Sequence, residues 1–238
     1  MTKHKFLTLF LVIFVQAACL SQEGLWKFGL QFRPGLPLNF INAGDDVSTQ
    51  DNVTYTNEQR FGRVLGGLMR YNITNAISFE TGILFNQRNF RISMDSLEND
   101  FESTLDYRIV GYEIPLTAMV FIQLDREIFM SAALGGSLNF FPSDVSTTDN
   151  ETQMIHETVR YRWVQTAVVA NLGFEYRSRG VGTFYLGGSF HLPFSPIYLS
   201  KIGFARNPLT QHSLDLQGTY LTLDFRFYFP EMSKNAKR

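Results

Sequence analysis

Hydrophobic and polar residues alternate along most of the chain with the two-residue period of β-strands. In the last such stretch, Leu223, Phe225 and Phe227 alternate with Asp224 and Arg226. An alternation of this kind gives a strand one apolar face and one polar face. The pattern predicts eight strands, at residues 27–33, 61–73, 77–86, 114–122, 130–140, 164–175, 184–192 and 221–229.

The connections between these stretches alternate in length. Short turns fall at residues 72–75, 125–127 and 178–182, whereas residues 41–58, 93–105, 143–157 and 200–212 are long polar segments that we expect to be loops. Tight periplasmic turns and longer external loops are typical of barrels of the bacterial outer membrane. The sequence therefore predicts an all-β protein, an eight-stranded antiparallel up-and-down transmembrane β-barrel with both termini on the periplasmic side.

Alternation alone does not say which face of the barrel points outward. A soluble ligand-binding barrel of the lipocalin type would place its apolar face inside. The polar face here is rich in small residues such as Gly135, Ser137, Gly187 and Ser189, which suit a narrow membrane-barrel lumen better than a soluble exterior. Aromatic residues toward the strand ends fit a girdle at the membrane interfaces: Trp26, Tyr71, Phe140, Phe141, Tyr176, Phe194 and Phe229.

The N-terminal segment has the features of a secretory signal peptide. A basic start is followed by an apolar run at residues 6–15, too short to span a bilayer, and by the small residues Ala17 and Ala18. We expect a signal peptide at 1–21, the barrel domain at 22–230 and a short basic tail at 231–238. The only cysteine, Cys19, is either removed with the signal or lipidated, so the mature domain is expected to fold without a disulfide.

Composition and motifs narrow the function classes. The net charge is only -1 for 238 residues, which gives no electrostatic pull toward nucleic acid. Beyond the signal segment no apolar run is long enough for a membrane helix, so residence in a membrane requires a closed barrel. The sequence contains no phosphate-cradling glycine loop, paired-cysteine zinc motif or His-Glu-x-x-His motif, and we expect no cofactor, metal site or catalytic site.

A short motif adds a family resemblance. Residues 112–116 read Tyr-Glu-Ile-Pro-Leu and open a central strand, a glycine-rich strand follows at 132–138, and an aromatic strand lies at 220–229. With the signal peptide and the eight alternating strands, these features resemble the PorT-type outer-membrane β-barrel family of the Bacteroidota (outer membrane protein beta-barrel domain). The resemblance covers essentially the whole mature chain. It implies the outer membrane of a Gram-negative bacterium and, as for some members, an association with type IX protein secretion.

Charged residues on the polar face form the best candidate site. Unpaired charges inside so small a barrel are costly, so we expect a hydrogen-bonded ion network that plugs the lumen, with an ion-conducting or gated path as the alternative. The expected network is structural and comprises Lys27, Arg33, Arg70, Glu80, Arg88, Glu113, Glu175, His191, Asp224 and Arg226.

The leading hypothesis is a non-enzymatic outer-membrane barrel that assists protein secretion or envelope assembly in a PorT-like role. Its expected partners are outer-membrane lipid, lipopolysaccharide and secretion-system or other envelope proteins, and not nucleic acid. One rival is a surface adhesion barrel whose loops bind a partner. The other is a lipid A-modifying enzyme that uses Ser189 and His191, which lie two residues apart and so share the lumen face.

Overall fold

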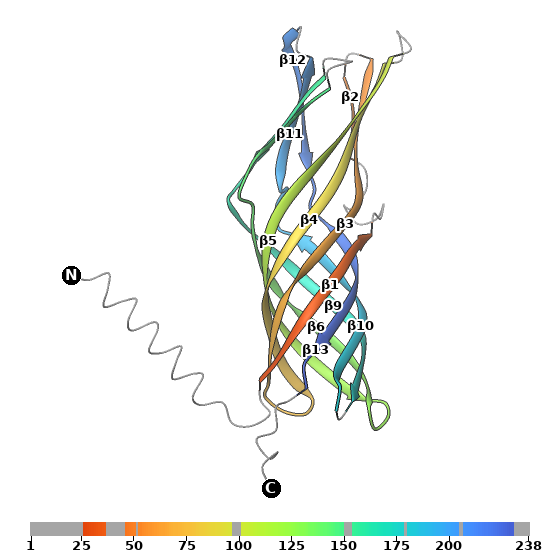
Figure 1. The fold of residues 1–238 in the computed structure, drawn as a ribbon. Helices are drawn as coiled ribbons and strands as arrows, with labels where there is room; N and C mark the ends of the chain where they lie inside the picture. Colours follow the sequence, from red (N-terminus) through yellow and green to blue (C-terminus); the bar gives the residue numbers. More distant parts are fainter. Residues whose placement is uncertain are drawn as a thin grey trace, which may run out of the picture.

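The computed structural model describes residues 26–36, 46–50, 52–96, 101–149, 154–178, 180–204 and 207–230. The expected signal peptide with Cys19, and the expected tail at 231–238, lie outside the described residues. No helix in the described part of the chain is long and apolar enough to cross a membrane. Its strands (Figure 1) are β1 (Trp26–Leu36), β2 (Asp46–Gln50), β3 (Val53–Asn72), β4 (Ile77–Ser96), β5 (Phe101–Gln123), β6 (Ile128–Phe140), β7 (Val145–Thr148), β8 (Met154–Arg160), β9 (Val164–Ser178), β10 (Gly182–Pro193), β11 (Tyr198–Phe204), β12 (Asn207–Leu216) and β13 (Tyr220–Tyr228).

Eight of these strands close into a barrel. Neighbours are hydrogen-bonded in the order β1, β3, β4, β5, β6, β9, β10 and β13, and β13 pairs with β1 to complete the ring. Every one of these pairings is antiparallel. Closure pairs the strand edges that a membrane would otherwise leave without hydrogen-bond partners. The predicted eight-stranded antiparallel barrel is confirmed.

The barrel presents an apolar outer surface and a polar lumen. Ile83 is 69% exposed and Leu134 is 64% exposed, whereas Ser137 and Ser189 are buried inside. The apolar face of each strand contacts the hydrocarbon of the membrane, and the polar face finds hydrogen-bonding partners in the lumen. The lipocalin-type alternative, with its apolar face inside, is therefore wrong. The belt of exposed apolar side chains includes Phe28, Leu30, Leu65, Phe79, Leu116, Val120, Leu172, Phe174, Leu186, Leu223 and Phe225.

The short turns identify the periplasmic end of the barrel. They connect β3 to β4, β5 to β6 and β9 to β10, as predicted. At the same end, the Trp26 and Tyr71 rings lie 4.7 Å apart, as centroids, where β1 pairs with β3. Aromatic contacts at this level fit the interfacial girdle of an outer-membrane barrel.

Three strands continue far beyond the apolar belt. β3, β4 and β5 contain 20, 20 and 23 residues, whereas a membrane-spanning strand needs about 9–11. Their far halves rise above the barrel, where β2 extends their sheet and a separate sheet of β7, β8, β11 and β12 lies against them (Figure 1). β7 lies beside β5, and β12 lies beside β2. We call this part the extracellular extension: β2, residues 53–60 of β3, 89–96 of β4, 101–109 of β5, and the second sheet.

The polarity of the strand faces inverts at the base of the extension. In β5 the inward residue Glu113 gives way to Ile109, while the outward residue Leu116 gives way to Arg108. Water replaces lipid outside, so the apolar side chains turn inward and form a core of their own. That core contains Tyr55, Phe90, Ile92, Met94, Leu105, Tyr107, Ile109, Phe141, Met154, Ile197, Tyr198, Ile202, Leu214 and Leu216.

Two expectations need correction at this point. Residues 41–58, 93–105, 143–157 and 200–212 are not simply loops, because most of their described residues belong to strands of the extension. The sequence of these segments looks like that of loops because exposed polar residues interrupt the apolar pattern, although every second position in their strands is buried or half-buried. Phe141 is 3% exposed and belongs to the extension core, not to the interfacial girdle.

Candidate functional site

The lumen of the barrel holds a dense set of ionisable side chains. In the described residues, the buried ionisable side chains other than histidine and tyrosine are four arginines and four carboxylates. Since each arginine carries one positive charge and each carboxylate one negative charge, their formal charges cancel. These residues come from six of the eight barrel strands: Arg33 in β1, Arg70 in β3, Glu80 and Arg88 in β4, Glu113 in β5, Glu175 in β9, and Asp224 and Arg226 in β13.

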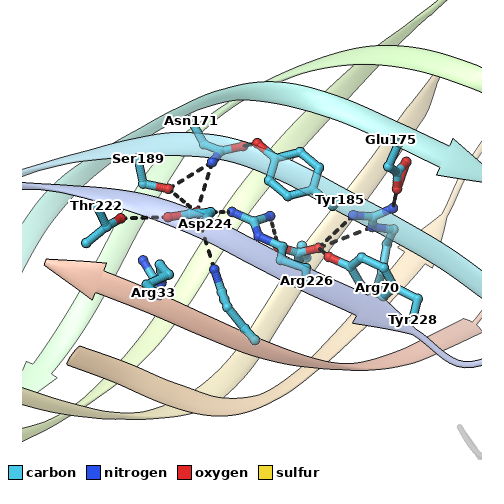
Figure 2. A network of polar contacts seen from close by, with 12 residues as sticks. Arg33, Arg70, Asn171, Glu175, Tyr185, Ser189, Thr222, Asp224, Arg226 and Tyr228 are labelled. Carbon is cyan, nitrogen blue, oxygen red and sulfur yellow. Dashed lines mark hydrogen bonds and ion pairs between the residues drawn. The ribbon is translucent and has the colours of Figure 1, made fainter.

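Arg70 joins two carboxylates at the periplasmic end of the network (Figure 2). Its Nε and Nη2 atoms each donate to Glu80 Oε2 at 3.1 Å, and its Nη1 donates to Glu175. Arg70 also stacks over the Tyr228 ring, whose centroid is 3.9 Å from the guanidinium carbon. The Tyr228 hydroxyl donates to Glu80. The guanidinium fork therefore fixes both carboxylates, as its planar geometry favours.

Arg226 connects this end to a second centre at Asp224. Its Nη1 donates to Glu80 Oε1 at 2.6 Å, and its Nη2 donates to Asp224 Oδ2 at 2.8 Å. Asp224 accepts further hydrogen bonds from neutral side chains, so its charge is distributed over many donors (Figure 2). These donors are Gln31 at 3.3 Å, Asn171 at 3.1 Å, Thr222 at 2.6 Å, and Ser189.

The upper part of the network centres on His191. Arg33 Nη1 lies 2.8 Å from His191 Nε2, and because a guanidinium only donates, the histidine nitrogen must accept. The ring proton is then on Nδ1, which faces Glu113 Oε1 at 3.6 Å. The imidazole stacks on Tyr220 with ring centroids 4.3 Å apart. His191 is therefore a neutral bridge between Arg33 and Glu113.

Arg88 marks the top of the lumen, just below the extension core. Its Nη1 donates to the Gly218 carbonyl at 2.9 Å, and its guanidinium carbon lies 4.2 Å from the Tyr220 ring centroid. Tyr220 donates to Glu113 Oε2 at 3.2 Å. The aromatic and peptide contacts hold this cation in place, and within the described part of the chain no carboxylate lies within hydrogen-bond distance of it.

The structure places nine of the ten expected network residues in the buried lumen. The tenth, Lys27, is half-buried in β1, where its Cα pairs with that of Arg70. Sequence reasoning did not single out the neutral residues that complete the network. The sequence does carry a signal for them, because each lies on the same strand face as an ionisable residue of the network. They are Gln31, Asn86, Asn171, Tyr185, Tyr220, Thr222 and Tyr228.

Ser189 and His191, the two residues that the lipid A-modifying hypothesis requires to act together, have different hydrogen-bond partners in the structure. Ser189 donates to Asp224 and accepts from Asn171 Nδ2 at 2.8 Å. His191 Nε2 is already occupied by Arg33. In this geometry His191 does not act as a base for the Ser189 hydroxyl. Within the described residues, no group of three or more His, Cys, Asp or Glu side chains is placed to hold a metal ion.

Solved structures provide a comparison for the fold. The outer membrane protein OprG from Pseudomonas aeruginosa superposes with a TM-score of 0.57 at 13% identity, over 88% of this chain and 98% of that one. The β domain of the Bordetella autotransporter BrkA gives 0.35 at 11% identity, with 87% and 99% covered. The outer membrane protease OmpT from Escherichia coli gives 0.30 at 10% identity, with 86% and 91% covered. Of these three structures, OprG is the one whose TM-score exceeds 0.5, and its likeness supports the barrel fold.

Sequence comparison agrees with the architecture. No curated protein sequence gives a significant match to the chain. The profile of the family described as "Outer membrane protein beta-barrel domain" matches residues 21–199, well over half of the chain. The chain therefore belongs to this family, and it is a β-barrel protein of the Gram-negative outer membrane.

Proposed function

We propose that this protein is a non-enzymatic, non-conducting anchor that presents its extracellular extension to other envelope components. Its more specific version is a PorT-like role that assists protein secretion or envelope assembly. The observation that carries the proposal is the extension itself. β3, β4 and β5 run unbroken from the lipid belt into a two-sheet structure with its own apolar core, which fixes the extension rigidly to the barrel.

The interior supports an anchor better than a channel. A conducting path would have to cross the charge-balanced ion network and then the apolar core directly above it. Side chains fill the interior of an eight-stranded barrel almost completely. Planar-bilayer recording with the purified protein is therefore expected to show no stable large conductance, and a steady current of porin size would refute this part of the proposal.

A trimmed barrel tests the anchoring role. In this variant short turns replace the long hairpins above the belt. The periplasmic connections of β3 to β4, β5 to β6 and β9 to β10 stay intact. We expect it to reach the outer membrane and to keep the heat-dependent gel shift of a closed barrel. In a strain lacking the gene, the full chain should restore protein export and the trimmed barrel should not.

The same strain separates the rival functions. Normal export from the deletion strain, together with loss of cell attachment to a surface or polysaccharide, would replace the secretion role with adhesion through the extension. Full restoration of export by the trimmed barrel would refute the proposal that export requires the extension. Lipid A from the deletion strain should be chemically unchanged, because Ser189 lacks a histidine base. A missing modification would overturn the non-enzymatic assignment.

A further inference from the structure

A groove of about 600 Å³ lies on the outer face of the extension, where β3, β4 and β5 leave the apolar belt. Arg60, Arg91 and Arg108 line it, together with Asn89 and Asp106. Val145 and Thr147 of β7 form part of its wall. The lining contains three guanidinium groups and one carboxylate, so it carries more positive than negative charge.

Strand register places two of these arginines symmetrically. Arg60 pairs with Asn89, and Asn89 pairs with Arg108, so the three residues form a row across neighbouring strands. At about 4.8 Å between strands, the backbones of Arg60 and Arg108 lie roughly 10 Å apart. Both side chains are long enough to converge over Asn89. This spacing suits a phosphate held between two guanidinium groups.

The charges in the groove leave one cation uncommitted. Arg91 is held by Asp106 through two hydrogen bonds, of 2.7 Å and 2.9 Å, so that carboxylate is already neutralised. Arg60 contacts Glu58 at 2.8 Å, an exposed pair of the kind that exchanges readily. Within the described residues the side chain of Arg108 has no hydrogen bond or ion pair. An anion would gain most from Arg108 and Arg60.

The height of the row relative to the belt indicates the source of the anion. In β5 the outward residues change from Leu116 and Tyr112 to Arg108 within a few positions. In β3 a register shift between Arg60 and Arg63 leaves Phe61 at the rim, 65% exposed. The row thus lies immediately above the hydrocarbon edge, at the level where headgroup phosphates occur. In helical membrane proteins, basic pockets at the headgroup level bind anionic lipid headgroups.

We propose that Arg60 and Arg108 bind a phosphate of the phosphorylated glycolipid of the outer leaflet, whose acyl chains lie along Phe61 and Tyr112 below. Arg91 stays paired with Asp106 at the back of the site, so that this carboxylate does not repel the phosphate. The proposal depends on the outer-membrane location and not on the proposed role in export. It assigns a specific lipid contact to one side of the barrel.

Native mass spectrometry of the detergent-purified protein tests the site. The probes are lipid A, the same glycolipid after removal of its phosphates, and inorganic phosphate. Wild-type protein should retain lipid A and lose at least about tenfold in affinity for the dephosphorylated form. Arg108→Gln should weaken lipid A binding by a similar factor, and the double variant R60Q/R108Q by more. Arg162→Gln, an exposed position near the belt but outside the groove, is the matched control and should bind normally.

Each outcome decides the proposal. Among the described residues the Arg108 side chain has no partner to lose, so Arg108→Gln should keep the heat-dependent gel shift. A loss of lipid A binding with an unchanged gel shift then reflects the site and not misfolding. Equal lipid A binding by wild type and R60Q/R108Q would overturn the site. Equal affinity for inorganic phosphate and lipid A would overturn the lipid as its source. Selective loss in the groove variants, with normal binding by Arg162→Gln, would support it.

Discussion

The extension core contains one histidine whose protonation should control the stability of the extension. His156 in β8 is fully buried, and its ring lies 4.2 Å from the Tyr107 ring as centroids. Its Nε2 is 2.8 Å from Ser200 Oγ, whereas its Nδ1 is buried without a hydrogen-bond partner. Burial alone lowers the pKa of His156 from 6.5 to about 4. The folded extension therefore keeps this imidazole neutral under conditions where an unfolded chain would protonate it.

The direction and size of the effect follow from this difference. Above pH 6.5 His156 is neutral in both the folded and the unfolded state, and the free energy of unfolding of the extension is at its highest. As the pH falls toward 4, only the unfolded state gains a proton, so this free energy decreases. At 1.36 kcal/mol for each pKa unit, the full loss is about 3 kcal/mol, of which about 2 kcal/mol is already lost at pH 5. Opening of the extension should become about thirtyfold more frequent between pH 7.5 and pH 5.

Hydrogen exchange measures this directly. Protection factors of β8 and β11 amides, corrected for the intrinsic exchange rate, should fall about thirtyfold from pH 7.5 to pH 5 in wild type. His156→Gln, which cannot titrate, should abolish most of the fall. His212→Gln is the control, because His212 is only half-buried beside Tyr55, and it should keep the wild-type response. A pH-independent wild type, or an unchanged fall in His156→Gln, would disprove the reasoning.

Three further predictions concern the barrel. Leu134→Arg, in the middle of the lipid face, should cost about 2–4 kcal/mol in folding into vesicles, whereas Thr104→Arg on the exposed face of the extension should be nearly neutral. Arg70→Met should lower the free energy of unfolding by about 3–5 kcal/mol, because Glu80 and Glu175 stay buried without their cation. The temperature at which the folded gel band disappears should fall accordingly, and adding Glu175→Gln should recover part of the loss. Gly135→Ala should lower the same temperature, because its new Cβ would lie 2.1 Å from the Leu116 carbonyl oxygen, whereas Gly67→Ala has nothing within 4 Å and should not. Equal behaviour of either matched pair, or no loss in Arg70→Met, would count against the described packing.

The membership of the lumen network could be predicted because a strand has only two faces. Once Arg226 is assigned to the polar face, Asp224 must share it, and both point into a closed barrel. The partners were harder to predict. Arg70 and Glu80 lie directly opposite across the short turn between β3 and β4, so hairpin register alone pairs them. The contact between Arg70 and Glu175 crosses the lumen, and its geometry depends on how the whole ring closes.

The extension could not be predicted from apolar stretches, although its signal was in the same alternation. Ile92 and Met94 occupy the same strand face as Glu80 and Arg88, but they serve as core instead of lumen. The rule that the polar face of each strand lines the lumen no longer holds above the membrane, where water replaces lipid outside the barrel. The informative signal in the sequence is the point at which the apolar face of a strand becomes polar and the polar face becomes apolar. This point coincides with the edge of the lipid.

That exchange also explains why basic residues collect at the base of the extension. A residue that points outward just above the hydrocarbon contacts both water and anionic headgroups. The guanidinium group of arginine interacts favourably with each, and its methylene stem packs against the apolar rim. In β5 the change from Leu116 to Arg108 needs no break in the strand, whereas β3 requires a register shift to bring Arg60 and Arg63 to the outer face. The bulge that sequence alternation could not reveal is thus what completes the row of arginines over the lipid edge.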